Sequence, residues 1–161
     1  MEPTKEAYEM IKRFESFSPR ACKAIKEEKY YSIGYGHYSP TVKKTDRVTQ
    51  EEAERLLYED VAKYSRQLAE SCPRLTQRQY DALVSLIYNI GWDNFRHSMT
   101  FIKCHNLGVS ALPSEAAARI ILWVRAAGRV LPGLQRRRVA EANYFLGYEK
   151  YKVIDGQIVE I

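Results

Sequence analysis

Residues 14–37 read FESFSPRACKAIKEEKYYSIGYGH, and the interpretation of the whole chain depends on this stretch. It joins a glutamate at the end of a helical pattern to a segment in which Gly34 and Gly36 bracket a tyrosine. Glycines inside a strand pattern leave room for a ligand or another backbone to approach. The stretch therefore indicates a site for chemistry.

Glu15 lies at the end of an amphipathic helical pattern, which Ser18 and Pro19 stop. A carboxyl group between two phenylalanines lies partly out of water, which disfavours its charged form and suits it to general acid catalysis. The alternative is an ordinary solvated surface glutamate. The helical pattern rests on apolar residues at spacings of three and four, namely Ala7, Tyr8, Ile11 and Phe14.

The stretch resembles the signature of phage-type lysozymes, the endolysins of glycoside hydrolase family 24. That signature is a catalytic Glu, then an Asp, then a Thr directly before Ile-Gly-Tyr-Gly-His, and here it corresponds to Phe14-Glu15-Ser16-Phe17 and Ser32-Ile33-Gly34-Tyr35-Gly36-His37. The resemblance extends from about Glu6 to Gly147. Its further motifs are Leu75-Thr76-Gln77, Ala82-Leu83, Asn89-Ile90-Gly91, Trp123-Val124-Arg125-Ala126, Leu131-Pro132-Gly133-Leu134 and Arg136-Arg137-Arg138.

The resemblance implies an α+β, lysozyme-like fold with a small N-terminal β-lobe and a C-terminal helical bundle joined by a long helix. Helix one should run to about Phe17, and the β-lobe should lie between Ser18 and Pro40. We expect one domain over residues 1–161, with an N-terminal helix and β-lobe at 1–48, a connecting helix at 49–71, a helical lobe at 72–147 and a hairpin at 148–161.

Capping boxes mark two predicted helix starts, at Thr49 with Glu52 and at Thr76 with Gln79. Gly91 closes the second of these helices. Further helices are expected over residues 95–107, 115–126 with Ser114 as the cap, and 134–145.

The C-terminal segment departs from the short family members. Two β-branched runs flank Asp155-Gly156, which is a strong signal for a β-hairpin. An isolated hairpin is marginal in water, so it should pack on the body of the domain or on a partner.

Asp60 is the one carboxylate on an otherwise apolar face of the connecting helix, so it needs a partner. His37 is the natural candidate, and the resemblance implies that the two form a structural ion pair. We therefore interpret His37 as structural and not as a catalytic base.

The family's Asp has no direct counterpart in this sequence. Counted forward from Glu15, its position falls on Ala24, and counted back from Ser32 it falls on Lys26. Neither side chain can orient a water molecule as a base. The intervening segment is two residues longer than usual, so a carboxylate from a displaced position could take over the role.

Glu28 is favoured over Glu27 for that role, because strand alternation from Ser32 places it on the same face as the hydroxyl if the strand extends that far. Ser32 replaces the family's Thr and keeps the hydroxyl that holds the water, with less rigidity. Alternatively, both glutamates are solvated loop charges.

The resemblance also suggests substrate-binding residues, namely Gly34, Tyr35, Asn89 and Ser98. For Asn89, a helix C-terminal cap is an equally good interpretation. Arg136, Arg137 and Arg138 lie within one helical turn and point in three directions, so they do not form one basic face for nucleic acid. We expect at least one to point toward Glu15, as in relatives, and the others to be solvated.

Composition agrees with one compact unit of 161 residues that are 45% hydrophobic. The net charge of +5 favours a polyanion such as a bacterial wall, a nucleic acid or an acidic membrane surface. The odd number of cysteines, Cys22, Cys72 and Cys104, indicates free thiols without a disulfide framework or zinc site. The chain shows neither a signal region nor a membrane-spanning run.

The sequence thus predicts a monomeric muramidase that needs no metal or other cofactor and acts on the peptidoglycan glycan strand, with inversion and with Glu15 as general acid. Such an enzyme would wait in the bacterial host cytoplasm until another protein breached the membrane. The alternative is a wall-binding protein on the same fold with weakened catalysis. A nucleic-acid binder would leave Glu15 and the paired glycines unexplained.

Overall fold

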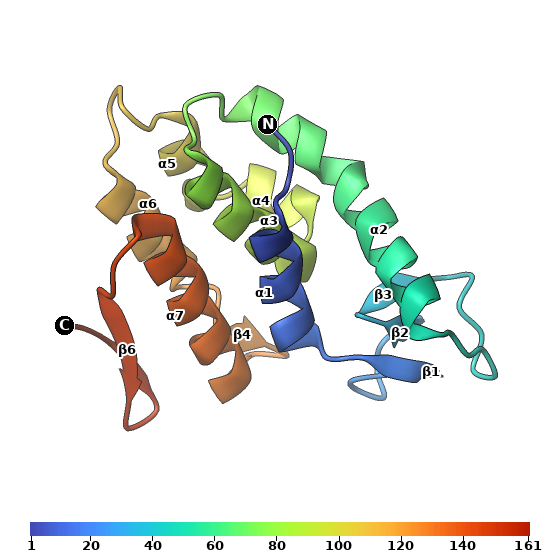
Figure 1. Cartoon of the computed structure of the whole chain (residues 1–161). Helices are drawn as coiled ribbons and strands as arrows, with labels where there is room; N and C mark the ends of the chain where they lie inside the picture. Colours follow the sequence, from blue (N-terminus) through green and yellow to red (C-terminus); the bar gives the residue numbers. More distant parts are fainter. The chain divides into compact units, whose positions relative to one another are not determined.

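The computed structural model describes residues 1–161, which form two compact units. The β unit comprises Tyr8–Tyr64, and the helical unit comprises Met1–Ala7 and Ser65–Ile161. Helices α1 (Lys5–Glu15) and α2 (Gln50–Ser71) each contribute residues to both units. Figure 1 shows the course of the chain. Helices and small antiparallel sheets together confirm the predicted α+β class.

The β unit contains a three-stranded antiparallel sheet in the order β1-β2-β3, which confirms the predicted β-lobe. A tight turn at Tyr35 and Gly36 pairs Ile33 with His37. Ile33 is buried with apolar side chains from both helices of the unit, including Ile11, Ala53, Leu57 and Val61. The strands are β1 (Ser18–Cys22), β2 (Tyr31–Gly34) and β3 (His37–Ser39).

Helix α1 ends at Glu15, earlier than the predicted end at Phe17. Ser16 has a φ of 58°, and its N–H still donates to the Lys12 carbonyl at 3.0 Å. A residue in this left-handed region turns the chain out of the helix. Glu15 therefore occupies the last helical position, directly before the turn into β1.

Helix α2 begins with the predicted capping box. The Glu52 N–H donates to the Thr49 hydroxyl at 3.2 Å, and the Thr49 N–H donates to the Glu52 carboxylate at 2.8 Å. Two backbone donors that have no intrahelical partner are thereby satisfied. The observed span of Gln50–Ser71 confirms the predicted helix at 49–71.

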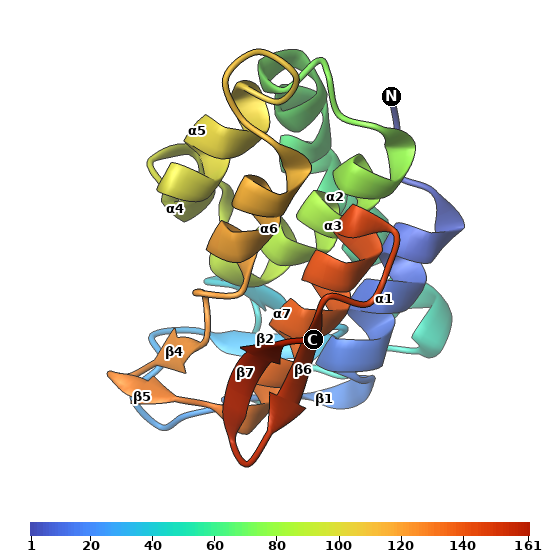
Figure 2. The same ribbon diagram turned by 90° about the vertical axis from the view of Figure 1, so that its left-hand side faces the viewer.

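The helical unit is built around α3, whose residues 79–87 are all buried. Helix α3 packs against α7, which also packs against α6 (Figure 2). The predicted capping box at Thr76 and Gln79 is present, and Gly91 ends the helix as expected. The helices are α3 (Gln77–Ile90), α4 (Trp92–Arg96), α5 (Met99–His105), α6 (Pro113–Ile120) and α7 (Pro132–Leu146).

The single helix predicted over residues 95–107 is wrong, because the chain breaks between α4 and α5. Ser98 makes the break: its hydroxyl donates to the Phe95 carbonyl at 2.6 Å and accepts from the Phe101 N–H at 3.2 Å. A serine that caps a new helix competes with continuation of the old one.

The predicted helix over 115–126 is wrong at both ends. Helix α6 starts at Pro113, because proline suits the first turn, and Ser114 lies inside the helix instead of capping it. It stops at Ile120, after which β4 (Arg125–Ala126) and β5 (Arg129–Val130) form a short hairpin. The last helix begins at Pro132 instead of residue 134 for the same reason as α6.

The C-terminal hairpin is confirmed as β6 (Tyr151–Ile154) and β7 (Gln157–Glu160). Its turn residues Asp155 and Gly156 both have positive φ, 49° and 74°, as a two-residue hairpin turn requires. The Gln135 amide donates to the Gly156 carbonyl at 2.7 Å. The hairpin therefore packs on α7, as Figure 2 shows, and not as an isolated ribbon.

All three cysteines are free. Burial raises the pKa of the Cys72 thiol to about 12, and burial also raises the pKa of Cys104 well above its usual range, while Cys22 is exposed. None of the helices has the length and apolar character needed to span a membrane.

Candidate active site

Glu15 lies against the turn that contains Gly36. A Cβ atom added at Gly36 would lie 2.8 Å from Oε2 of Glu15 and 3.3 Å from its Cδ. Gly36 also has a φ of 83°, where side chains are disfavoured. The second glycine of the motif therefore permits the close approach of backbone and carboxyl group.

We expect Gly36→Ala to lower turnover through displacement of the Glu15 carboxyl group. The added methyl group needs that space, and a misplacement of about 1 Å costs on the order of 100-fold in rate. Left-handed backbone strain adds about 1–2 kcal/mol of instability. The measurement is the rate of wall clearing by folded protein, together with thermal melting.

Gly156→Ala is the matched control, because Gly156 has a similar φ of 74° with no atom within 4 Å of the added methyl group. This variant should share the strain and keep its turnover. Equal loss of turnover in both variants would contradict a specific effect of Gly36 on Glu15.

Gly34 and Tyr35 contribute to packing within the β unit. A Cβ atom at Gly34 would lie 2.9 Å from that of Ala53, so the absent side chain lets β2 close onto α2. Tyr35 is 5% exposed; its ring lies 5.6 Å from that of Phe17, and its hydroxyl accepts from the Gln50 amide at 3.2 Å. Their roles in substrate binding remain predictions.

Ser32 lies in the middle strand of the sheet, directly between Cys22 on β1 and Tyr38 on β3. Side chains directly opposite one another in neighbouring strands share a face, so these three form a row across the sheet. The neighbouring Ile33 is buried on the other face. The Ser32 hydroxyl makes no hydrogen bond within the chain, so it is available to a ligand.

Strand β2 begins at Tyr31, so the strand alternation that favoured Glu28 does not extend to it. Glu28 instead closes a turn, in which its N–H donates to the Ile25 carbonyl at 3.2 Å. Its carboxylate accepts the Ala24 N–H at 2.9 Å, whereas Glu27 is exposed. The Glu28 carboxylate therefore lies beside Ala24, where the family's Asp falls when counted from the general acid.

His37 and Asp60 are brought together within the β unit. Nδ1 of His37 lies 2.7 Å from Oδ2 of Asp60, and the Lys63 ammonium donates to Oδ1 at 2.6 Å. Both side chains of the histidine–aspartate pair are 16% exposed. Burial raises the pKa of Asp60, but hydrogen bonds from His37 and Lys63 outweigh it, so that the net pKa is lowered.

We expect Asp60→Asn to destabilise the fold at neutral pH by about 1.5–3 kcal/mol, the range for hydrogen bonds to a charged group. The pKa of Asp60 is lower in the folded protein than in the unfolded chain, where it is about 3.9, so ionised Asp60 stabilises the fold fully above that unfolded value. This stabilisation is lost as the pH falls through the folded-state pKa. The difference in melting temperature between wild type and variant should therefore shrink in acid. Thermal melts from about pH 7 to about pH 3 measure it.

Asp155→Asn serves as the control for this pH series, since Asp155 lies exposed in the hairpin turn. It should melt close to wild type throughout. A constant difference between wild type and Asp60→Asn across the range would contradict stabilisation by an ionised Asp60.

The helical unit contains a buried charge network that was not predicted from the sequence. The Glu141 carboxylate accepts hydrogen bonds from Arg137 at 3.0 Å, from Arg138, and from the Ser85 hydroxyl at 2.7 Å. Arg138 also donates to the side-chain oxygen of Asn89. The spacing of the arginines three and four residues before Glu141 on one helix was the signal available in the sequence.

This network corrects the expectation that the arginines not directed toward Glu15 are solvated. Arg137 and Arg138 are buried at 3% and 0% exposure, and only Arg136 is exposed. Proximity of an arginine to Glu15 remains a prediction. Asn89 does not cap α3, since Gly91 does, and its side chain is held by Arg138.

Ser98, the other predicted substrate residue of the helical unit, uses its hydroxyl at the joint between α4 and α5. Its place is therefore fixed by helix capping. A role in substrate binding remains a prediction.

The mixed fold, a motif glutamate set against a glycine turn, and a histidine–aspartate pair in the same unit together define a lysozyme-like protein. The Phage lysozyme family model matches residues 12–141. The chain belongs to the phage lysozyme family.

Two solved structures share this fold over most of both chains. The muramidase domain of SpmX from Asticaccaulis excentricus is 32% identical, with a TM-score of 0.77 and coverage of 89% of this chain and 96% of that one. The endolysin from Escherichia coli O157:H7 phage FAHEc1 is 29% identical, with a TM-score of 0.77 and coverage of 91% and 94%.

The endolysin of Bacillus phage B103 is 37% identical over 149 residues, which cover 89% of this chain and 54% of that protein. The chain thus spans about half the length of the Bacillus phage relatives that it matches.

Proposed function

We propose that this chain is a muramidase that hydrolyses the β-1,4 bond between N-acetylmuramic acid and N-acetylglucosamine in peptidoglycan. The observation that carries the proposal is the Glu15 carboxyl group, fixed at the end of α1 against Gly36 of the Ile-Gly-Tyr-Gly-His motif. Membership of the phage lysozyme family and likeness to a muramidase domain support it.

Cleavage of a glycosidic bond requires a proton for the leaving oxygen and a nucleophile at the anomeric carbon. Glu15 supplies the proton. For the inverting route, a second carboxylate activates a water molecule on the opposite face of the sugar, and the two carboxyl groups are about 6.5–9.5 Å apart to leave room for it. This chemistry uses side chains alone and needs no metal or organic cofactor.

Glu28 is our proposed second carboxylate. The Ala24 N–H orients one of its oxygens at 2.9 Å and leaves the other oxygen for a water molecule. The longer loop would thus place the Glu28 carboxylate near Ala24, although Glu28 itself lies at a different position in the sequence. The Ser32 hydroxyl would be the second group that hydrogen-bonds the attacking water.

We expect Glu28→Gln to lower turnover by about 10²–10⁴-fold, the usual contribution of a general base. The glutamine side-chain oxygen still accepts from Ala24, so the loop should keep its shape. Glu27→Gln, one residue earlier and exposed, is the control and should stay near wild type. Wall-clearing rates of both variants test whether Glu28 is the general base. Full activity of Glu28→Gln would exclude Glu28 from the mechanism.

The second candidate function is wall binding with weakened catalysis. It is favoured by one observation: Ala24 and Lys26 stand where the family has its Asp. Turbidity clearing of permeabilised bacteria, with mass spectrometry of the product's reducing end, separates the two. Binding to walls without new reducing ends would favour this second function.

We propose further that the protein acts as a monomer on the glycan strand. Like the phage endolysins it resembles, it would be made in the bacterial host cytoplasm and would reach the wall after the membrane is breached. Sedimentation of the purified protein tests the first statement.

A further inference from the structure

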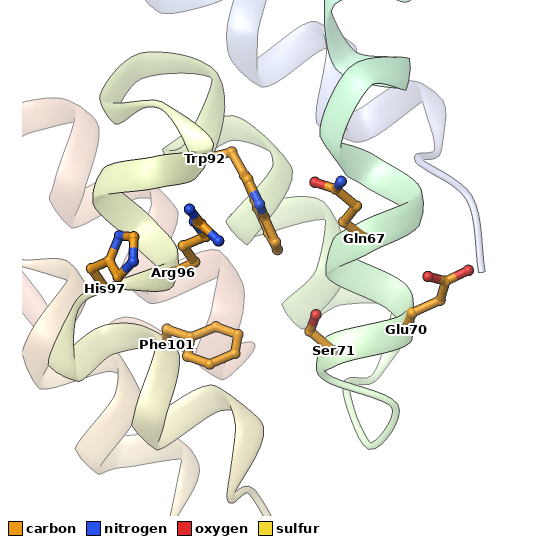
Figure 3. A pocket seen from close by; sticks show the side chains of 7 residues that line it. All are labelled: Gln67, Glu70, Ser71, Trp92, Arg96, His97 and Phe101. Carbon is orange, nitrogen blue, oxygen red and sulfur yellow. The ribbon is translucent and has the colours of Figure 1, made fainter.

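A cavity of about 430 Å³ lies in the helical unit, between the C-terminal part of α2 and helices α4 and α5. This volume falls within the range of small-molecule sites, about 300–1,000 Å³. None of the residues so far assigned to catalysis lines it. Its lining includes Gln67, Glu70, Trp92, Arg96, His97 and Phe101 (Figure 3).

Trp92 gives the cavity a fixed aromatic surface. Its ring packs 5.8 Å from that of the fully buried Phe95, which in turn meets Phe101 edge to face at 5.7 Å. Figure 3 shows the indole projecting into the space between α2 and α4, with Gln67 facing it from α2. The ring is thereby held from behind while it remains open toward the cavity.

Some polar groups around the indole are held by hydrogen bonds within the chain, and several of their donors and acceptors remain unused. Nε of Arg96 donates to the Asp93 carboxylate at 2.9 Å, so the other two guanidinium nitrogens are available to donate to a ligand. Nδ1 of His97 lies 2.8 Å from the Asp93 carbonyl oxygen. The Gln67 amide and the Trp92 indole N–H make no hydrogen bond within the chain.

The charges around the cavity balance. Arg96 contributes one cation, already paired with Asp93, and Glu70 contributes one carboxylate, which Arg66 binds at 2.9 Å. A polyanion would find no net positive field here. An aromatic surface beside an amide and a guanidinium instead suits an uncharged, polar ligand with one apolar face.

We propose that this cavity is an accessory binding site for an N-acetylated hexose unit. The apolar C–H face of the sugar ring packs on Trp92, while its acetamido and hydroxyl groups bond to Gln67 and Arg96. The identity of the sugar rests on the proposed function, because the peptidoglycan strand is a polymer of such units. A strand held here would be retained between cleavage events.

The direct test is an NMR titration of the ¹⁵N-labelled Glu15→Gln protein with tri-N-acetylchitotriose. The chain has two tryptophans, and the Trp123 indole N–H already donates to the Thr100 hydroxyl at 3.0 Å, so it serves as an internal reference. We expect the Trp92 indole signal to shift saturably and that of Trp123 to stay in place. An unmoved Trp92 signal, or equal shifts of both, overturns the proposal.

A second measurement uses binding to insoluble peptidoglycan in the same Glu15→Gln background. Gln67→Ala removes one hydrogen-bonding side chain from an exposed position on α2 and should weaken the affinity about 2- to 10-fold. Gln157→Ala, an exposed glutamine of β7, is the matched control and should bind as the parent does. Equal affinities of the two variants would overturn the proposal.

Failure of this site and failure of the proposed function give different results. If the Trp92 indole signal does not shift and wall hydrolysis still depends on Glu15, the accessory site is disproved and the proposed function stands. A saturable Trp92 shift in a protein whose wild type releases no reducing ends removes the muramidase activity and keeps the sugar site.

Discussion

Glu15→Gln should remove most turnover on bacterial walls while it leaves the fold intact. The two side chains are nearly isosteric, so we expect the amide to take the place of the carboxyl group beside Gly36 at the end of α1. Loss of the transferable proton should cost about 10²–10⁴-fold in rate. The measurement is the initial rate of turbidity clearing, with circular dichroism and thermal melting to verify folding.

Glu9→Gln is the matched control, since Glu9 lies on the same helix, is 57% exposed and makes only a loose contact of 3.8 Å with Lys12. It should clear walls at the wild-type rate. Undiminished clearing by folded Glu15→Gln would exclude Glu15 as the general acid and, with it, the proposed muramidase mechanism.

Local patterns predicted the features whose causes are local. The capping boxes at Thr49 and Thr76 and the hairpin turn at Asp155 each depend on groups within a few residues, and all three are present. The paired glycines indicated a place where another group could approach, and the structure shows that at Gly36 this group is the Glu15 carboxyl. These contacts position the candidate acid.

The features that the sequence did not predict also have partners within four residues, but each depends on a choice among competing partners that a simple residue pattern does not encode. The helix predicted over residues 95–107 was expected to continue past Ser98, but the serine hydroxyl bonds to backbone groups on both sides and ends the helix. Arginines are usually exposed to solvent, and exposure was expected for those of this run of three that do not point toward Glu15. Two of the three are buried instead, because they form ion pairs with Glu141 on the same helix. Strand alternation likewise did not apply to Glu28, because its loop folds back on Ala24.

The buried network leads to the largest expected effect on stability. Glu141 is 0% exposed and holds the charges of both Arg137 and Arg138, which are themselves buried. In Glu141→Gln the two cations lose their carboxylate with no access to water. Removal of one partner from a buried ion pair costs about 3–5 kcal/mol, which corresponds to roughly 6–20 °C in melting temperature for a chain of this size.

Glu59→Gln is the control, because Arg55 precedes Glu59 by four residues just as Arg137 precedes Glu141, but on an exposed helix surface. Side-chain exposures of 67% and 56% make that pair worth about 0.3–0.5 kcal/mol, so the variant should melt near wild type. Thermal and urea unfolding of both variants gives the comparison. If both lost equally little, Glu141 would not be compensating the arginine charges, and their burial would have to rest on the carbonyl oxygens of Ser85 and Trp123. The Glu141 carboxylate also binds Arg138, which donates to Asn89, so we expect the one substitution to weaken both the core and the placement of a predicted substrate residue.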